Sequence, residues 1–550
     1  MFDKYKNLKY FIRYYKDQNR LIKSLAVVMI SASSLGLFLP YFVSRRLVEL
    51  MDSSYFEVLK YSFIITLIIL FHQIFVYLWE KIATLFINNV TVEIRKDLLI
   101  KLNNSKYSEI KKKTSGYYLE RINNDVLEIS SFFTNILGIT VDCLTNFGFL
   151  TAIFVLSIPC GIIFSLAIII IIIIELIKTK INLHYTDLSK EVLELFNTKI
   201  NENFKGIKDI KSLGIKAEVV FDIDILNNKI AEIQINKDKK IALLNRMKSF
   251  IQYGNETLLI VYAVGFLFPI KAISIVSFLM IINYGGFMYE LVGYIAQIKD
   301  WFVQGDFKAA RLLEVLNSHN IQEYGPIEKI NNFSIIVNDL SYCYEFEEAL
   351  LENISFKIPE KSLIAFVGQS GSGKTTLFSL ISRLLICENN SIFVGDIDIN
   401  DLSEKCLRDN ICLINQEPFL LHDTIYRNIQ IVKPKAKKEE IEKVCKKAFV
   451  YEEIIGLKDG LDTIVNESGS NLSTGQKQRI VIARALLKET SILLFDEPTA
   501  NLDKTNQEAF FRMIQEIKDK RTILLITHKL NDYSIFDQVY EIKKGRLIEY

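Results

Sequence analysis

The sequence predicts two parts: an α-helical membrane domain with six transmembrane helices, followed by an α/β domain built around a phosphate-binding loop. Half of the 550 residues are hydrophobic although 24% are charged, so the apolar residues must gather in blocks. Those blocks lie before residue 300. After them, a glycine-rich loop stands between a predicted strand and a predicted helix.

Six apolar segments are each long enough to cross a bilayer, which takes about 20 mostly apolar residues. They are residues 21–43, 61–83, the two halves of 132–181, 250–268 and 273–296. The run Ser157-Ile158-Pro159-Cys160-Gly161 predicts a turn that divides 132–181, and Pro269 marks a second hairpin turn. Each segment alone is compatible with a buried helix of a soluble protein, but six of them favour membrane spans.

The distribution of Lys and Arg predicts the orientation of these spans. The leader before residue 21 and the polar loops 95–121 and 180–246 are basic, whereas the turns at Pro159 and Pro269 carry almost no charge. We therefore expect a multi-pass protein of the cytoplasmic membrane with its N-terminus and C-terminal half in the cytosol. Both long loops have helical composition, and we expect them to project into the cytosol.

Net charge and cysteine usage exclude other classes. The net charge of +2 gives no reason to expect a nucleic-acid partner. The seven cysteines form no CxxC pair, so we expect free thiols in a reducing compartment and neither a disulfide framework nor a cysteine metal site.

The apolar run before residue 368 predicts a strand that leads into Gly368-Gln369-Ser370-Gly371-Ser372-Gly373-Lys374-Thr375. This GxxxxGK[ST] pattern lets backbone N–H groups wrap phosphates at a helix N-terminus, with Thr376 in the first turn of the helix. Lys374 is expected to reach the β- and γ-phosphates, and the Thr375 hydroxyl to ligate Mg²⁺. The loop therefore predicts ATP and Mg²⁺ as ligands.

A second apolar run, at residues 491–495, predicts a buried parallel strand that ends in Asp496 and Glu497. Such strands present ligand-binding groups at their C-terminal ends. Asp496 is expected to hold Mg²⁺, and Glu497 to polarise the attacking water as general base.

The run Asn471-Leu472-Ser473-Thr474-Gly475-Gln476 resembles the signature motif of the ATP-binding cassette (ABC) family. After the motif, we expect a helix at residues 477–487. The resemblance implies that Ser473, Gly475 and Gln476 bind nucleotide, that Tyr344 stacks on adenine, and that Gln416 reaches Mg²⁺ and water. It also implies that His528 contacts the γ-phosphate, that residues 500–503 form the D-loop, and that Glu467 belongs to an exporter-specific element. One position departs from the family: Thr474 stands where glycine is usual, so slower hydrolysis is an open question.

The membrane half resembles ABC exporters as well, with 116–125 and 206–213 similar to their coupling loops. The resemblance implies a membrane domain at 1–310 and, at 330–550, an α/β P-loop nucleotide-binding domain with helical and antiparallel β subdomains. Each chain has one phosphate loop and one signature motif, so two chains are needed. We expect a homodimer, with a related half-transporter as the alternative partner.

The expected function is ATP-driven export of an amphipathic or hydrophobic peptide, drug or lipid. A lipid flippase and a non-transporting membrane ATPase that senses a ligand are the alternatives. Ionisable groups inside membrane spans usually mark a pathway, and the candidates are Asp142, Glu175, Glu256 and Glu290. Unpaired acids beside aromatic rings suit a cationic amphipathic substrate such as a basic peptide. Alternatively, Glu175 pairs with Lys178 and the other acids only hold the bundle together.

Overall fold

The computed structural model describes residues 5–49, 55–317, 321–344, 349–466, 469–499, 504–527 and 534–549. The chain divides into two compact units. The first comprises Met1–Asn103 with Thr114–Ser318, and the second comprises Asn104–Lys113 with His319–Tyr550.

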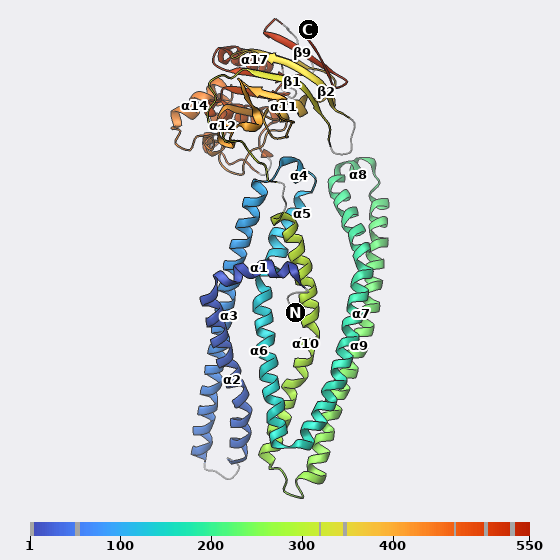
Figure 1. Ribbon diagram of the computed structural model, residues 1–550. Coiled ribbons are helices and arrows are strands. Elements are labelled where there is room, and N and C mark those ends of the chain that lie inside the picture. The colour runs from blue at the N-terminus through green and yellow to red at the C-terminus, as the bar shows by residue number, and fades with distance from the viewer. Residues whose placement is uncertain are drawn as a thin grey trace. The chain divides into compact units, whose positions relative to one another are not determined.

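The first unit is entirely helical in its described residues (Figure 1). Its long helices are α2 (Asn19–Glu49), α3 (Tyr55–Asn103), α6 (Val126–Leu156), α7 (Ile158–Lys205), α9 (Lys216–Tyr262) and α10 (Ile275–Leu316). Its short helices are α1 (Lys6–Asp17), α5 (Ser115–Glu120), α8 (Ile207–Leu213) and the π-helical turns η3 (Arg121–Asp125) and η4 (Ala263–Leu267). The polar loops expected between spans are thus largely continuations of long helices.

Four stretches of the described chain are long and apolar enough to cross a membrane, judged by length and composition alone. They are Leu59–Asn103, Ser115–Leu156, Ile158–Lys205 and Lys216–Leu267. A shorter apolar stretch lies at Ile275–Gly286, and several side chains of α2 and α10 lie outside the described residues. A helical membrane domain is therefore present, while the count of six spans stays a prediction.

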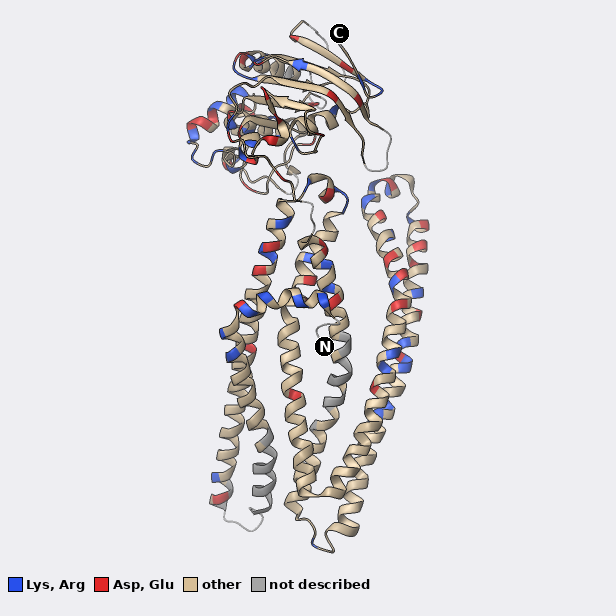
Figure 2. Cartoon of the chain, in the orientation of Figure 1, with Lys and Arg blue, Asp and Glu red and all other residues tan. Residues whose placement is uncertain are grey.

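Both predicted hairpin turns lie where helices end. Only Ser157, in extended conformation, separates α6 from α7, and Pro159 lies in the first turn of α7. The second hairpin turns between η4 and α10, where Lys271 has a φ of 53°. In Figure 2 the charged residues of α7 and α9 gather toward α8, and the opposite ends are apolar.

The N-terminal helix α1 is tied to the long helices by hydrogen bonds at both of its ends. Asp306 on α10 accepts from the main-chain nitrogens of Asn7 and Leu8, at 3.1 and 3.3 Å. Near the other end, the Tyr14 hydroxyl donates to Asp97 on α3 at 2.6 Å. The helix is thereby held across α3 and α10, with Leu8, Phe11, Tyr14 and Tyr15 buried beneath it.

A buried ion-pair network joins η3 to α10. Asp125 is fully buried, and its two carboxylate oxygens lie 3.1 Å from Lys308 Nζ and 3.0 Å from Arg311 Nε. Arg121, also buried, contacts Glu314 at 3.1 Å. Since buried charges persist only when paired, this network fixes η3 against α10.

In its described residues, the second unit contains two sheets, a four-stranded antiparallel sheet in the order β2-β1-β4-β5 and a six-stranded mostly parallel sheet in the order β10-β9-β3-β8-β7-β6. Their strands are β1 (Ile335–Tyr342), β2 (Leu351–Ile358), β3 (Leu363–Val367), β4 (Ile392–Val394), β5 (Ile397–Asp398), β6 (Ile411–Ile414), β7 (Ile492–Asp496), β8 (Thr522–Ile526), β9 (Gln538–Lys543) and β10 (Arg546–Glu549). Only β10 runs antiparallel in the larger sheet.

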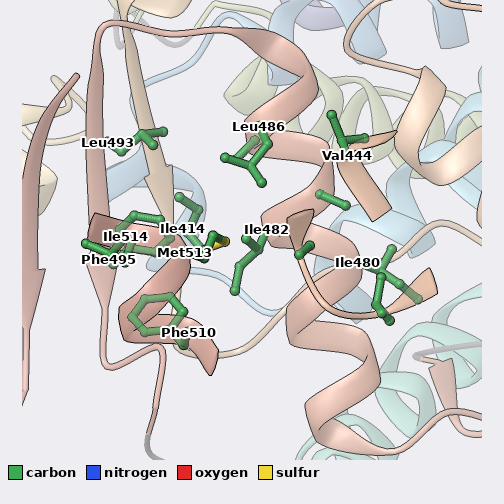
Figure 3. Packing of buried hydrophobic residues seen from close by; sticks show 14 of the residues in the cluster. Ile414, Val444, Ile480, Ile482, Leu486, Leu493, Phe495, Phe510, Met513 and Ile514 are labelled. Atoms are coloured by element: carbon green, nitrogen blue, oxygen red, sulfur yellow. The ribbon is translucent and has the colours of Figure 1, made fainter. Parts of the chain in front are cut away.

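Helices and the smaller sheet cover both faces of the larger sheet. The helices are α11 (Lys374–Ile381), α12 (Glu404–Asn410), α13 (Ile425–Gln430), α14 (Lys438–Lys447), α15 (Tyr451–Ile455), α16 (Thr474–Lys488) and α17 (Lys504–Lys518). Figure 3 shows one face, where Leu493 and Phe495 of β7 pack with side chains of α16 and α17. Alternate residues of the same strand, Ile492 and Leu494, join the core on the other face. Because these strands are buried on both faces, their sequences are continuous apolar runs.

The segment between α3 and α5 belongs to the second unit. It holds the short helix α4 (Tyr107–Lys111). Ser105 forms a β-bridge with Ile321, and Gln322 donates to the Asn104 carbonyl at 2.9 Å. This association had no signal in the sequence, because it depends on main-chain contacts between segments more than 200 residues apart.

Candidate active site

The strands that precede the predicted site residues end at one edge of the larger sheet. In the parallel pairing, Phe366 of β3 and Asp496 of β7 both lie opposite Ile526 of β8. The next residues continue this alignment: Thr527 donates to the Phe366 carbonyl at 3.1 Å, and Glu497 donates to the Ile526 carbonyl at 3.1 Å. The phosphate loop and the acidic pair therefore emerge at the same level, one strand apart.

The glycine-rich loop follows β3 and ends at α11. Gly371 and Gly373 have φ angles of 80° and 100°, which side-chain-bearing residues rarely adopt. A Cβ on Gly368 would lie 2.4 Å from the Ile542 carbonyl oxygen, and one on Gly373 would lie 2.6 Å from Leu351 Cδ2. The glycines are thus required both by conformation and by the close approach of neighbouring residues.

Lys374 is buried inside this loop. Its ammonium donates to the carbonyls of Gly368 and Gln369 at 2.9 and 2.8 Å. Burial lowers the pKa of Lys374, and the carboxylates of Glu497 and Asp496 act in the opposite direction. The loop therefore holds a cation near the two acids.

The loop fits a nucleotide phosphate. The first turn of α11 has no side-chain cap, which leaves its N–H groups facing the loop. The Ser372 hydroxyl is buried and has no hydrogen-bond partner in the described structure. Phosphate oxygens require hydrogen-bond donors. The uncapped amides of α11, the unpaired Ser372 hydroxyl and the buried Lys374 ammonium supply them.

The oxygen groups at this edge also suit Mg²⁺. Asp496 is 4% exposed at the end of β7, and Thr375 lies in the first turn of α11. Among the described residues, no three His, Cys, Asp or Glu side chains form a metal cluster. Mg²⁺ is commonly held by one or two carboxylates together with substrate phosphates rather than by such a cluster, so the donor set fits.

Glu497 and Gln416 form a pair at the same edge. Gln416 Nε2 donates to Glu497 Oε2 at 2.8 Å. Glu497 has a φ of 48°, an uncommon conformation for this residue type that is frequent at functional sites. The arrangement can hold a water molecule beside a carboxylate that accepts its proton.

Tyr344 lies beside the first turn of α11. Its hydroxyl is 3.1 Å from the Thr376 hydroxyl, and 37% of the residue is exposed. One ring is thus available for stacking next to the phosphate loop, but its contact with adenine stays a prediction.

The helix at the signature motif begins earlier than expected. We expected it to start at residue 477, whereas α16 starts at Thr474 with Ser473 as its N-cap. The Ser473 hydroxyl accepts from the Gln476 amide at 3.2 Å, and the Gln476 side chain accepts from the Ser473 amide at 3.0 Å. This capping box places Thr474 and Gly475 in the first helical turn, where their backbone N–H groups belong to a helix N-terminus.

Some predicted residues lie outside the described structure. These are His528, Glu467 and residues 500–503. Ser370 lies in the described part of the phosphate loop. The roles of all site residues named from the sequence therefore stay predictions.

The membrane-half acids differ in their surroundings. Glu175 is buried and lies 3.4 Å from Lys178 Nζ and 2.9 Å from Lys248 Nζ. Glu175 therefore pairs with Lys178, as the alternative prediction from the sequence stated. Its second partner, Lys248, was not predicted from the sequence. Asp142 and Glu256 are half-buried, and their carboxylates form no hydrogen bond or ion pair within the described chain. The side chain of Glu290 lies outside it.

The sequence prediction missed two polar groups in the same half. Asn146 Oδ1 and Trp79 Nε1 are buried without a hydrogen-bond partner in the described residues. The spacing of Asp142 and Asn146, four residues apart, was the available signal, because it places both on one helix face.

Together, the apolar helices and the phosphate loop beside two strand-end acids define a membrane-embedded P-loop ATPase. Comparison with known families narrows this class. Residues 23–290 match the family model of the ABC transporter transmembrane region, and residues 351–500 match the ABC transporter family model. The chain belongs to the ABC transporter family, with both regions fused in one polypeptide, and it is an ATPase coupled to transport.

Curated relatives cover most of the chain. An uncharacterized ABC transporter ATP-binding protein of Bacillus subtilis, YknV, is 29% identical over 84% of this chain and 77% of its own length. The multidrug resistance-like ATP-binding protein MdlB of Buchnera aphidicola from Acyrthosiphon pisum is 25% identical over 99% and 94%. An ATP-dependent lipid A-core flippase of Vibrio vulnificus is 26% identical over 84% and 80%.

A solved structure shows the fold. A bacterial Atm1-family ABC exporter with ATP bound superposes with a TM-score of 0.77, covering 96% of this chain and 94% of that one, at 20% identity. The fold is therefore that of an ABC exporter, and the relatives' names differ in substrate.

Proposed function

We propose that the chain exports an amphipathic or hydrophobic substrate across the cytoplasmic membrane, as a dimeric half-transporter driven by ATP hydrolysis. The observation that carries the proposal is the convergence of Lys374, Asp496 and Glu497 at one sheet edge, in a chain that also holds long apolar helices. The convergence supplies a hydrolytic site, and the helices supply a membrane path.

In this proposal each residue has a distinct role. Lys374 neutralises the β- and γ-phosphate oxygens, and the α11 amides orient them. Asp496, Thr375 and Gln416 would hold Mg²⁺, which would withdraw charge from the phosphate oxygens. Glu497, positioned by Gln416, accepts a proton from the attacking water.

Two copies of the chain are proposed to complete two sites. The first turn of α16, with Ser473 and Gly475, would contact nucleotide held by the phosphate loop of the partner subunit. A homodimer is favoured because the phosphate loop, the strand-end acids and the signature motif all occur in this one chain. A related half-transporter remains the alternative partner.

The proposed orientation places the second unit in the cytosol. Lys and Arg are abundant in the leader and in the parts of α7 and α9 near α8, and sparse at the turns after α6 and η4. Basic segments are retained on the cytoplasmic side.

The test is reconstitution of the purified full chain in proteoliposomes with ATP added outside. Under the proposal, molecules whose nucleotide-binding domain faces outward use this ATP to move a fluorescent amphipathic cation or a fluorescent lipid into the vesicle. Glu497→Gln abolishes this accumulation. ATP hydrolysis that responds to amphiphiles without movement of either probe would support a sensor ATPase instead.

A lipid flippase is the second candidate, because relatives that bear that name are 26% identical over 84% of the chain and 34% identical over 48%. A dithionite assay, which reports the leaflet that holds a labelled lipid, separates lipid flipping from export of a soluble cation. ATP-dependent movement of the labelled lipid between leaflets, with no accumulation of the soluble cation, would favour the flippase.

A further inference from the structure

We propose that Asp142, Asn146 and Trp79 form an intramembrane binding site for the protonated amine of an amphipathic substrate. This inference rests on the proposed function and names the substrate class that the membrane path takes. Asp142 lies about 21 Å along α6 from Leu156, at about 1.5 Å per residue. That depth is within a hydrocarbon core of about 30 Å, where a carboxylate is retained mainly for function.

Asp142 lies on the interior face of α6. From residue 138 to residue 156, the exposed residues of α6 form one stripe, which comprises Thr140, Leu144, Phe147, Thr151 and Val155. At about 100° per residue, Asp142 lies on the opposite side, together with the buried residues Ile139 and Asn146.

The same face packs on two other helices. One turn before Asp142, a Cβ on Gly138 would lie 3.7 Å from Met29 Cε on α2 and 3.9 Å from Trp79 Cζ2 on α3. Asp142 is nonetheless half-buried, whereas Ile139 and Asn146 are 4% and 9% exposed. The carboxylate is therefore directed into the bundle at a point where its neighbours do not enclose it.

The described apolar core has different partners before and after this level of α6. One cluster takes side chains of α6 from Val126 to Leu137 and packs them against α1, α3 and α10. Another begins at Phe149 and packs against α7, α9 and α10. The stretch between them, residues 138–148, buries polar Asn146 together with apolar Ile139 and Val141.

One buried acceptor on this face of α6 is unsatisfied. Asn146 Nδ2 donates to the main-chain oxygen of Asp142 at 2.8 Å, which brings the amide beside Asp142, and its Oδ1 is buried without a partner in the described residues. Buried polar groups are nearly always hydrogen-bonded, so an additional hydrogen-bond donor is expected here.

The chemistry of these groups selects a protonated amine. The Asp142 carboxylate supplies charge, and Asn146 Oδ1 supplies a second acceptor for an N–H group. The Trp79 ring can contact a cation through its face, and Met29 and Ile139 offer apolar surface to a chain. A quaternary ammonium has no N–H to donate, and a neutral alcohol lacks the charge.

The test uses the full chain in nanodiscs with Trp301→Phe, which leaves Trp79 as the single tryptophan. The probes are dodecylamine, dodecyltrimethylammonium and dodecanol, which share one chain length. We expect dodecylamine to alter Trp79 emission and to bind at least about tenfold more tightly than the other two. Asp142→Asn should weaken dodecylamine binding by about tenfold or more and leave dodecanol binding unchanged.

Three further variants keep the result decisive. Asp142→Glu should still bind dodecylamine more tightly than the other two probes, and Asn146→Leu should reduce this difference in affinity. Thr140→Val, on the exposed stripe, should leave the difference unchanged. Equal binding of the three probes, or unchanged amine affinity in Asp142→Asn, would overturn the proposal. Binding is measured separately from transport. If the chain binds the amine but transports no probe, the result contradicts the proposed export function and leaves the proposed binding site standing.

Discussion

Gln416 Nε2 donates a 2.8 Å hydrogen bond to Glu497 Oε2. The two residues follow β6 and β7, which are adjacent parallel strands. The bond therefore links the ends of two neighbouring strands and holds the Glu497 carboxylate at the edge where the phosphate loop emerges.

Glu497→Gln should retain ATP binding and lose turnover. The substitution preserves shape but removes the proton acceptor, and loss of a general base commonly costs about 10²–10⁴-fold in rate. We expect the variant to accumulate as a closed dimer with ATP. Size-exclusion chromatography of the purified full-length protein with ATP bound measures this. ATPase activity near that of the wild type would remove Glu497 from this role.

Lys374→Ala should abolish ATP binding or hydrolysis while membrane insertion stays intact. The ammonium is the buried cation of the phosphate loop, and without it the phosphates lose their main counter-charge. Binding of a fluorescent ATP analogue and ATPase rates measure the effect, with Lys361→Ala, outside the loop, as the matched control. Unchanged affinity and turnover would show that the loop assignment is wrong.

Removal of Mg²⁺ should stop hydrolysis reversibly. We expect EDTA to abolish ATPase activity and added Mg²⁺ to restore it. If Asp496 holds the ion through water, Asp496→Asn should raise the Mg²⁺ concentration for half-maximal activity by about 10–100-fold. An unchanged Mg²⁺ titration in this variant would exclude Asp496 as a contributor.

Much of the fold follows from local signals. The predicted turn at Ser157 is confirmed: Ser157 is extended, and Pro159 lies in the first turn of the next helix, where its missing N–H is tolerated. The predicted strand before Glu497 is confirmed as β7. The start of α16 was placed three residues late because the Ser473–Gln476 capping box was read only as a nucleotide motif.

The contacts that the sequence did not reveal join distant segments. Glu175 and Lys178 are one helical turn apart, so their pairing was accessible from spacing. Lys248 is on a different helix, and its contact with Glu175 depends on how α7 packs against α9. The bond between Tyr344 and Thr376 likewise depends on the fold of the second unit.

Asp125→Asn should destabilise the first unit by about 3–5 kcal/mol, because it leaves Lys308 and Arg311 without their buried counter-charge. Glu128→Gln is the matched control. Glu128 also contacts Lys308, at 3.3 Å, but its side chain is 53% exposed, so about 0–1 kcal/mol is expected. Thermal unfolding of both purified variants in the same detergent measures the difference. Equal midpoints would contradict a structural role for the buried network.

Glu256 and Glu290 should contribute to selection of cationic substrates. Glu256 is half-buried, its carboxylate forms no hydrogen bond or ion pair in the described structure, and its neighbour Asn255 donates to the Tyr289 hydroxyl at 2.7 Å. An unpaired carboxylate beside aromatic rings attracts cations. We expect Glu256→Gln and Glu290→Gln, singly and together, to reduce stimulation of ATPase and transport by a hydrophobic cation more than by a neutral analogue of the same size. Glu175→Gln is the control: Glu175 is already paired with two lysines, so its loss should change stability without changing the ratio between the two substrates. If cationic and neutral substrates respond identically in the Glu256 and Glu290 variants, these acids only hold the helices together.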